Sequence, residues 1–171
     1  MKSYTTDYIG IIRTPFTELQ GMPIQPTGAR DVLGEVIVNP ELTEGLKDLD
    51  GFSHIYLIYH LHKVTDTRLT VIPFMDTVPR GVFATRAPVR PSRLGLSVVE
   101  LLEVKENRLT VRGVDMLDSS PLIDIKPYVA AFDCPANASS GWMTATHDEV
   151  GSKRADDRFI KQEVSRDADK K

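Results

Sequence analysis

Arginine and proline are concentrated between Asp76 and Glu100, where they could bind phosphate groups. No acidic residue lies between these two acids, whereas four arginines do, which gives the window a net charge of +4. The other 17 of the 21 basic residues are set against all 24 acids, so the rest of the chain carries −7. A basic rim for phosphates and a solvated loop whose arginines pair with acids elsewhere both explain this pattern. The four arginines are Arg80, Arg86, Arg90 and Arg93, and Pro88 and Pro91 stiffen the segment around the last three.

A second segment, from Asp115 to Tyr128, brings three acids, two serines, a lysine and a tyrosine into fourteen positions. Its Asp118-Ser119-Ser120-Pro121 sequence is typical of a turn in which side chains bond to nearby backbone amides, and such turns can hold a small polar ligand. In the strand expected after it, Asp124 and Lys126 share a face. A turn followed by one ion pair between strands explains the same residues without any ligand.

Histidines and prolines mark two further segments. His60 and His62 are two residues apart and His54 shares their face, which is how barrel strands present metal ligands. No glutamate follows closely, so we expect no metal site, because hydrogen-bonded or surface histidines explain the spacing better. Pro23-Ile24-Gln25-Pro26 predicts a rigid extended connector, or else a ligand-binding wall in which Gln25 presents its amide.

The elements that would position these residues are mostly short strands with alternating apolar residues. The longest, 53–61, places Ile55, Leu57, Tyr59 and Leu61 on one face and the histidines on the other. Segments 96–104 and 109–114 flank a turn at 106–108 and predict a hairpin. Further strands are expected at 8–14, 34–38, 69–72, 81–84 and 122–125. Many short strands separated by Gly and Pro predict an all-β fold, either a barrel or a sandwich.

Helices are expected in two places. Asn39 as N-cap, Pro40 at the first helical position and a shared face of the leucines at 42, 46 and 49 predict a helix over 40–49. The charge-rich end of the chain, from about Ser152, is expected to form a solvated helix with a frayed end. That helix would dock on the barrel or on a second subunit, or remain free.

The composition is that of a globular domain, with 171 residues, 41% hydrophobic and 26% charged. Taken as a total, the net charge of −3 argues against a polybasic nucleic-acid binder. No apolar run approaches the ~20 residues of a membrane span, and the first residues lack the apolar core of a signal peptide. We therefore expect a cytoplasmic protein that does not enter a membrane, with its single cysteine, Cys134, as a small packing residue.

Five runs of residues, taken in this order, resemble the TsaA-like family, also called the TrmO or YaeB-like family. They are 9–16 (IGIIRTPF), 23–26 (PIQP), 49–55 (LDGFSHI), 81–91 (GVFATRAPVRP) and 124–128 (DIKPY). The resemblance covers roughly residues 8–133. It implies an all-β fold, a single-sheeted antiparallel β-barrel with short helices, over residues 1–140. A C-terminal extension, 141–171, would follow as a helical or disordered tail.

The resemblance also implies an activity. Its members bind S-adenosylmethionine (SAM) and methylate N6 of threonylcarbamoyladenosine at position 37 of tRNA, usually as homodimers with the cofactor site near the subunit interface. Two alternatives remain open. One is a SAM-binding barrel that acts on a substrate other than tRNA, and the other is a metal-dependent barrel that uses the three histidines.

The family's cofactor-binding positions carry over onto eleven residues of this sequence. They are Ile24, Gln25, Pro26, His62, Lys63, Arg86, Leu96, Asp118, Ser119, Ser120 and Pro121. Two departures from the family pattern matter. Ser119-Ser120 replaces Gly-Thr, which strains the backbone if that turn requires a positive φ. Ser92-Arg93-Leu94 replaces Asn-Pro-Ile, which adds a base and removes a rigid proline.

The implied reaction needs a group that makes a weak nucleophile reactive. The substrate nitrogen is a ureido nitrogen with a delocalised lone pair, so a base or hydrogen-bond acceptor is expected. The candidates are Asp118, Asp124 and Tyr128, while Lys126 would pair with Asp124 or hold a substrate carboxylate. A further set, Arg86, Arg90 and Arg93, would contact tRNA phosphates or the threonyl carboxylate.

Overall fold

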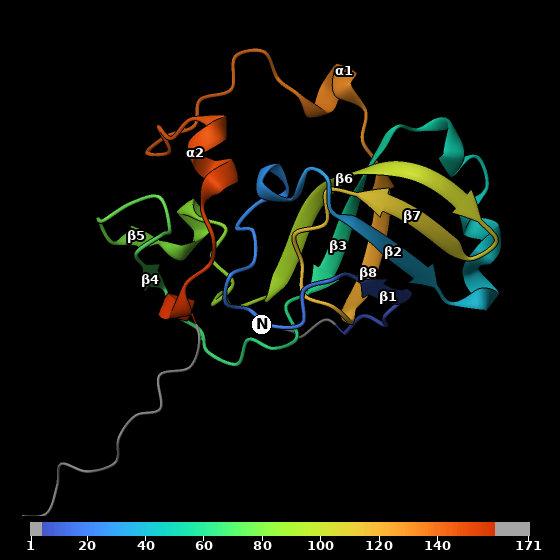
Figure 1. The fold of residues 1–171 in the computed structure, drawn as a ribbon, viewed down its shortest axis with the longest axis horizontal. Helices are drawn as coiled ribbons and strands as arrows, with labels where there is room; N and C mark the ends of the chain where they lie inside the picture. The colour runs from blue at the N-terminus through green and yellow to red at the C-terminus, as the bar shows by residue number, and fades with distance from the viewer. Residues whose placement is uncertain (1–4, 160–171) are drawn as a thin grey trace, which may run out of the picture.

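The computed structural model describes residues 5–159, and within them six strands close into an antiparallel β-barrel. They are β1 (Gly10–Arg13), β2 (Leu33–Val38), β3 (His54–His60), β6 (Leu94–Lys105), β7 (Arg108–Arg112) and β8 (Ser120–Pro127). The strands neighbour one another in the order β1-β2-β7-β6-β3-β8, and β1 pairs with β8 to close the sheet (Figure 1). The expected single-sheeted antiparallel barrel is confirmed, and the predicted hairpin forms between β6 and β7.

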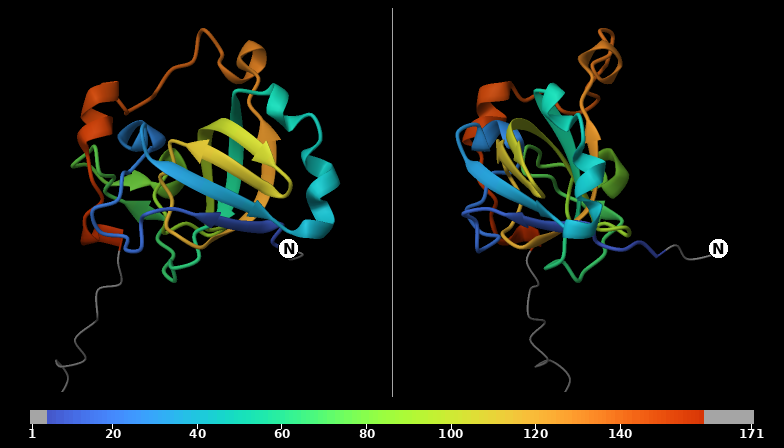
Figure 2. Two further views of the ribbon diagram at one scale, coloured as in Figure 1. Left: turned by 45° about the vertical axis from the view of Figure 1, so that its right-hand side comes forward. Right: turned by 90° about the vertical axis from the view of Figure 1, so that its right-hand side faces the viewer.

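Alternating side chains fill the interior of the barrel, whose curved sheet Figure 2 shows from two further directions. On β3, Ile55 and Leu57 are fully buried and Tyr59 is nearly so, while the residues between them face outward as predicted. Other strands contribute fully buried residues such as Leu109 and Leu122. Burying each such Leu or Ile side chain contributes about 1.5–3 kcal/mol. The alternating pattern therefore supplies both the strands and the core that holds them.

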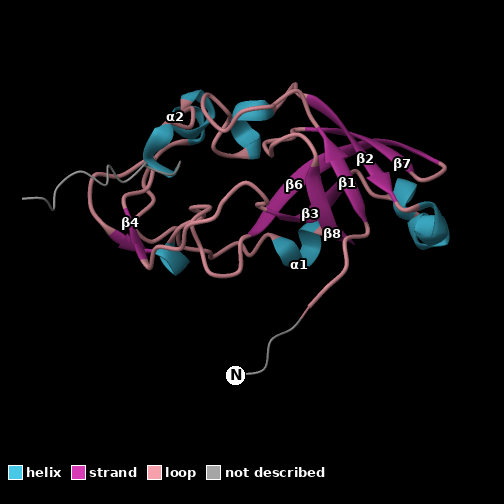
Figure 3. Ribbon diagram, turned by 90° about the horizontal axis from the view of Figure 1, so that it is seen from below, coloured by secondary structure: helices cyan, strands magenta, loops and turns pink. Residues whose placement is uncertain are grey.

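A smaller lobe extends from one end of the barrel. It contains a two-stranded sheet of β4 (Thr70–Val71) and β5 (Arg80–Gly81), a 3₁₀ helix at Val82–Ala84 and the loop 85–93. Its own apolar cluster consists of the buried residues Val64, Val71, Val82, Ala87 and Val89. Figure 3 shows β4 and the later helix α2 (His147–Ser152) at the end of the molecule opposite β7.

The segment that follows the barrel returns over this lobe. It contains α1 (Ala130–Asp133), α2 and a 3₁₀ helix at Asp157–Phe159. A capping box between Thr146 and Glu149 starts α2. Ala155 exchanges backbone hydrogen bonds with Gly21 and Met22, and the Phe159 ring packs edge-on against Phe74. The residues up to 159 thus dock on Gly21, Met22 and Phe74 of the same chain, outside the barrel strands on which docking was one of the expected arrangements.

The expected helix from about Ser152 is wrong for the described residues, because α2 ends at Ser152 and the chain then extends to pair Arg154 with Pro23. The remainder of that prediction, residues 160–171, lies outside the described residues. Among residues 5–159, no helix is long and apolar enough to cross a bilayer. The division of the chain at 140 stays a prediction.

The helix predicted over 40–49 forms as two 3₁₀ helices, Pro40–Leu46 and Leu49–Gly51. Asp48 has a φ of 65° between them, and Asn39 makes no side-chain cap hydrogen bond. A 3₁₀ helix has three residues per turn, so the leucines do not share one face and Leu42 is 41% exposed. The strand expected at 81–84 is mostly the 3₁₀ helix Val82–Ala84. The packing role expected for Cys134 is also wrong, because this residue is exposed.

Candidate functional site

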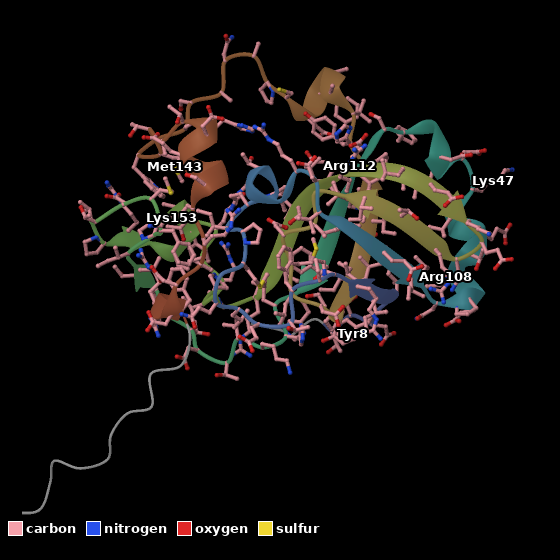
Figure 4. All side chains as sticks on the ribbon, viewed as in Figure 1. Tyr8, Lys47, Arg108, Arg112, Met143 and Lys153 are labelled. Atoms are coloured by element: carbon pink, nitrogen blue, oxygen red, sulfur yellow. The ribbon has the colours of Figure 1, made fainter. Side chains whose placement is uncertain are left out.

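A cavity of about 930 Å³ lies between the end of the barrel and the smaller lobe. Four segments that are far apart in the sequence form its wall. The barrel and its loops contribute Tyr59, Gly95, Asp115 and Ser120, and the lobe contributes Arg86, Pro88 and Arg90. The connector contributes Ile24 and Gln25, and the C-terminal segment contributes Trp142, Met143 and His147. In Figure 4, Met143 lies at the end of the molecule remote from Lys47, which marks the far end of the barrel.

The connector and the lobe meet at the cavity wall. Gln25 Oε1 accepts a hydrogen bond of 2.8 Å from the Arg86 guanidinium. Pro23 and Pro26 fix the backbone on either side of Gln25, and Pro26 begins a 3₁₀ helix, Pro26–Ala29, on which α2 packs. This wall is therefore preorganised, with an amide and a cation already in contact.

A chain of hydrogen bonds joins three polar side chains at the barrel end of the cavity. The Tyr59 hydroxyl lies 3.2 Å from Ser97 Oγ, and Ser97 donates to Asp115 Oδ1 at 2.6 Å. Tyr59 sits at a β-bulge where the register of β3 against β8 shifts, and bulges commonly redirect side chains beside functional sites. Its ring lies against Gly95, where an added Cβ would be 2.3 Å from a ring carbon.

The surroundings of these groups set their charge. Burial raises the pKa of Asp115 to about 6, against the opposing effects of the Ser97 hydrogen bond and the Arg86 charge. Burial also raises the pKa of the Tyr59 hydroxyl, and the nearby Asp115 charge adds to the effect. Burial, followed by the charge of Lys63, lowers the pKa of His62. At neutral pH the cavity therefore holds an ionised carboxylate, a neutral phenol and a neutral imidazole.

The Asp118 turn stands beside the cavity, and only its Ser120 lines the wall. The Asp118 carboxylate accepts from Thr14 N at 3.0 Å and from Ser119 Oγ at 2.8 Å, and it pairs with Arg13 at 3.2 Å. Burial raises the pKa of Asp118, but these hydrogen bonds and the Arg13 charge outweigh it and hold the pKa below its usual value. Ser119 has a φ of 61°, which is the strained conformation expected from the loss of glycine.

The other proposed catalytic residues do not reach the cavity. Asp124 and Lys126 form an ion pair of 2.8 Å on the outward face of β8. The Tyr128 ring packs against the rings of His54 and Tyr56. None of the three described residues lines the cavity, so their catalytic role stays a prediction.

The arginine window divides between the two explanations. Arg80 pairs with Asp76 at 2.8 Å, as a structural loop would predict. Arg86 and Arg90 line the cavity and have no acidic partner among the described residues. Arg93 does not line it and instead donates to the Thr65 carbonyl at 2.7 Å, from a backbone φ of 49°. A tRNA contact by Arg93 stays a prediction.

Two of the three histidines considered as metal ligands have side-chain hydrogen-bond partners. His60 Nδ1 lies 2.7 Å from the Tyr8 hydroxyl, and His54 Nδ1 lies 3.0 Å from Ser53 Oγ. Within residues 5–159, no group of three or more His, Cys, Asp or Glu side chains is placed to hold a metal ion.

Comparison with known proteins identifies the family. Residues 11–134 match the model of the tRNA-methyltransferase O N-terminal domain. The chain belongs to this family. A probable S-adenosyl-L-methionine-binding protein of Pyrococcus abyssi is 50% identical over 152 residues, which cover 89% of this chain and 83% of that protein. The mouse tRNA (adenine(37)-N6)-methyltransferase is 33% identical over 143 residues, which cover 78% of this chain and 33% of the mouse enzyme.

A solved structure of the tRNA-methyltransferase O family has the same fold. The crystal structure of TrmO from Pseudomonas aeruginosa superposes with a TM-score of 0.70 at 35% identity, over 82% of this chain and 63% of that one. The chain therefore spans less than two thirds of the Pseudomonas protein and about a third of the mouse enzyme.

The structure brings together most of the positions carried over from the tRNA-methyltransferase O family. Those that line the cavity are Ile24, Gln25, His62, Lys63, Arg86, Leu96 and Ser120. Those outside its wall are Pro26, Asp118, Ser119 and Pro121. Segments separated by as many as 96 positions thus meet at one cavity, which is the arrangement that a shared ligand site requires.

Two residues of the cavity wall, Asp115 and Trp142, were not predicted from the sequence. Asp115 stands three residues before Asp118, in a segment already singled out, but nothing in its spacing indicated that it turns inward. Trp142, the only tryptophan, donates from Nε1 to the Ala84 carbonyl at 2.7 Å and lies under the Arg80 guanidinium. A single bulky aromatic residue in a polar segment was the available signal for docking, because such side chains are rarely left exposed.

Proposed function

We propose that this chain binds S-adenosylmethionine in the cavity and transfers its methyl group to N6 of an adenine in tRNA. The proposal rests on the convergence of the family's cofactor positions from the connector, the end of β3, the lobe and β6 on one preorganised wall. Relatives named for S-adenosylmethionine binding and for tRNA adenine-N6 methylation support it.

The chemistry of the wall suits this cofactor. Ile24 and Leu96 offer apolar surface to an adenosyl group, while Lys63 and Arg86 offer positive charge to a carboxylate. When bound, the cofactor supplies a methyl group activated by positively charged sulfur. The cavity, at about 930 Å³, lies at the upper end of the ~300–1,000 Å³ of small-molecule sites, which leaves room for a nucleoside beside the cofactor.

We propose further that the methylated base is threonylcarbamoyladenosine at tRNA position 37. The threonyl carboxylate of that nucleoside needs a cation inside the cavity, and the wall offers Arg86 and Arg90, which form no salt bridge among residues 5–159. We propose the same two arginines as contacts for tRNA phosphates.

Methylation assays on matched tRNAs test both levels of this proposal. The purified chain is incubated with methyl-labelled S-adenosylmethionine and one tRNA prepared with or without the threonylcarbamoyl group, and nucleosides are analysed by mass spectrometry. Label only in the threonylcarbamoylated tRNA is expected. Label on unmodified adenine contradicts the finer substrate, and cofactor binding without label in any tRNA contradicts tRNA methylation and favours another substrate.

A salt titration tests the basic rim. Replacing Arg86 and Arg90 together by Ala is expected to lower tRNA affinity and reduce the slope of log K against log salt by about 0.7–0.9 per lost phosphate contact. The matched control is Lys47→Ala, because Lys47 is an exposed base at the far end of the barrel (Figure 4). An unchanged slope in the double variant contradicts the assignment.

We propose also that the chain forms a homodimer. Leu94 and Leu96 on β6 line the cavity and are 45% and 52% exposed, and such an exposed apolar pair favours burial against a second copy. Light scattering coupled to size exclusion is expected to give twice the 19.1 kDa chain mass, and Leu94→Asp is expected to give the monomer. A wild-type monomer at micromolar concentration contradicts this assembly.

A further inference from the structure

We propose that Asp115 is a catalytic residue that accepts the proton leaving the adenine nitrogen during methyl transfer, and that Ser97 and Tyr59 position its carboxylate. The proposal rests on the proposed function. It differs from the expectation drawn from the sequence, which placed the base among Asp118, Asp124 and Tyr128.

Position favours Asp115 over every other acid in the described residues. Only two acids line the cavity, Asp115 and Asp156. Both oxygens of Asp156 accept from Arg158, at 2.7–3.0 Å, so that carboxylate is committed to an ion pair. Asp115 receives one side-chain hydrogen bond, from Ser97 to Oδ1. Its Oδ2 therefore has no side-chain donor among residues 5–159 and is available to a ligand.

The acids expected from the sequence are held elsewhere. Asp118 is occupied by Thr14, Ser119 and Arg13 beside the cavity. Asp124 pairs with Lys126 on the outward face of β8 and also accepts from the Ile125 amide. Both oxygens of each of these two carboxylates have donors, whereas Asp115 has a side-chain donor on Oδ1 alone among residues 5–159.

Two buried hydroxyl groups, those of Ser97 and Tyr59, fix the orientation of the Asp115 side chain. Ser97 is 3% exposed and can donate only one hydrogen, which it gives to Asp115. Tyr59, which is 6% exposed, supplies the hydrogen that Ser97 Oγ accepts, and the absence of a Cβ at Gly95 makes room for its ring. Such a relay of buried donors holds a carboxylate in one rotamer, as a positioned proton acceptor requires.

The proton and charge balance of the step is complete. The nitrogen forms its bond to the methyl carbon as the carbon–sulfur bond breaks, and the sulfur keeps that electron pair and becomes neutral. Asp115 Oδ2 takes the proton from the nitrogen and becomes a neutral carboxylic acid. The methylated nitrogen is left neutral, and Asp115 then returns its proton to solvent.

The electrostatic surroundings make Asp115 a better base than an exposed aspartate. Burial raises its pKa, and the Ser97 hydrogen bond, the backbone amide of Asp115 itself and the Arg86 charge from the lobe act in the opposite direction. Tyr59 from β3 faces the same carboxyl group through Ser97. The other titratable or charged groups that line the same cavity are His62, Lys63, Arg90, His147 and Asp156. An acceptor that remains ionised at neutral pH, yet binds a proton more readily than a surface carboxylate, matches general-base catalysis.

The test compares Asp115→Asn with wild type in single-turnover methylation of tRNA between pH 5 and 9. Wild type is expected to rise with pH and level off above an inflection near 6. Asp115→Asn is expected to lose about 10²–10⁴-fold in rate and to lack this inflection. Its cofactor affinity, measured by calorimetry, is expected to stay within about threefold of wild type, since a proton acceptor acts on the other substrate. Asp50→Asn, an exposed carboxylate on a distant 3₁₀ helix, is the control.

A positioning variant supplies a second arm. Ser97→Ala removes a hydrogen bond that favours the ionised form, so it is expected to move the inflection to higher pH and retain catalysis. Carbon-13 NMR of the aspartate carboxyls in the free protein is expected to show the same upward shift without any reaction. If Asp115→Asn does not fold, the pH profile of Ser97→Ala and the carbon-13 titration test the role of Asp115 instead.

Each outcome separates the inference from the function on which it rests. A wild-type protein that methylates no tRNA contradicts the proposed function and, with it, this role for Asp115. A wild type that methylates tRNA while Asp115→Asn keeps its rate within tenfold, or keeps the inflection, overturns the inference alone. An inflection that Ser97→Ala leaves in place overturns the positioning role.

Discussion

Replacing Asp115 by Asn is expected to stabilise the fold at neutral and alkaline pH, a result opposite to that of most substitutions in a protein interior. The pKa of Asp115 is about 6 in the folded protein, against a usual value of 3.8 that it regains on unfolding. The folded state therefore binds the proton more tightly, and this group's contribution to stability falls as pH rises from about 4 through 6. Above that range the ionised carboxylate costs the fold about 3 kcal/mol, at about 1.4 kcal/mol per pKa unit.

Asparagine removes this cost and keeps an oxygen for the Ser97 hydrogen bond. We expect Asp115→Asn to raise the free energy of unfolding by about 1–3 kcal/mol at pH 8 and by close to nothing at pH 4. Urea denaturation at both pH values measures the difference, with Asp50→Asn as the exposed control. A destabilised variant at pH 8, or a gain of equal size at both pH values, refutes the reasoning that burial governs this carboxyl group.

Two further expectations concern the walls of the cavity. Gly95→Ala is expected to lower the free energy of unfolding by about 1–3 kcal/mol, because its added Cβ would meet the Tyr59 ring. Gly81→Ala is the neutral control, because a Cβ there meets nothing within 4 Å, and a denaturant titration measures both variants. Equal stabilities for the two variants would show that the ring has room to move. Trp142→Ala removes the hydrogen bond to the Ala84 carbonyl. Limited proteolysis is therefore expected to cut the segment around residues 135–146 faster, and cofactor affinity is expected to fall. An unchanged cleavage rate would mean that Trp142 does not hold the segment in place.

The barrel was predictable from the sequence because its strands obey a local rule. Side chains alternate between two faces, so Ile55, Leu57 and Tyr59 indicated both the strand and its buried side. The helix over 40–49 was only partly predictable, because an αL residue at Asp48 interrupts it, and the pattern of leucines contains no sign of that turn. Local periodicity predicts strands and helices, whereas an interruption such as that at Asp48 depends on how the two ends of the segment pack against the rest of the fold.

The candidate site was predictable only where the family resemblance reached. Gln25, His62 and Arg86, which the family motifs carried over, lie together in the cavity wall, and their role in binding a cofactor stays a prediction. Asp115 was not singled out, because it lies in the loop between β7 and β8 and its inward orientation depends on Ser97, which precedes it by 18 positions on β6. The C-terminal wall was missed for a related reason, since Trp142 docks through a backbone carbonyl that leaves no pattern in the sequence.

Because residues 140–159 form one wall of the cavity, the barrel and the cavity need not form at the same time during synthesis. When Pro127 emerges from the ribosome, all six barrel strands are outside it, whereas residues 140–159, which contribute one wall of the cavity, are still inside. Because chains fold progressively from the N-terminus during synthesis, the barrel can close before its cavity does. A nascent chain would then hold a complete scaffold with an open groove, and its capacity to enclose a small ligand would arise as the last described residues dock.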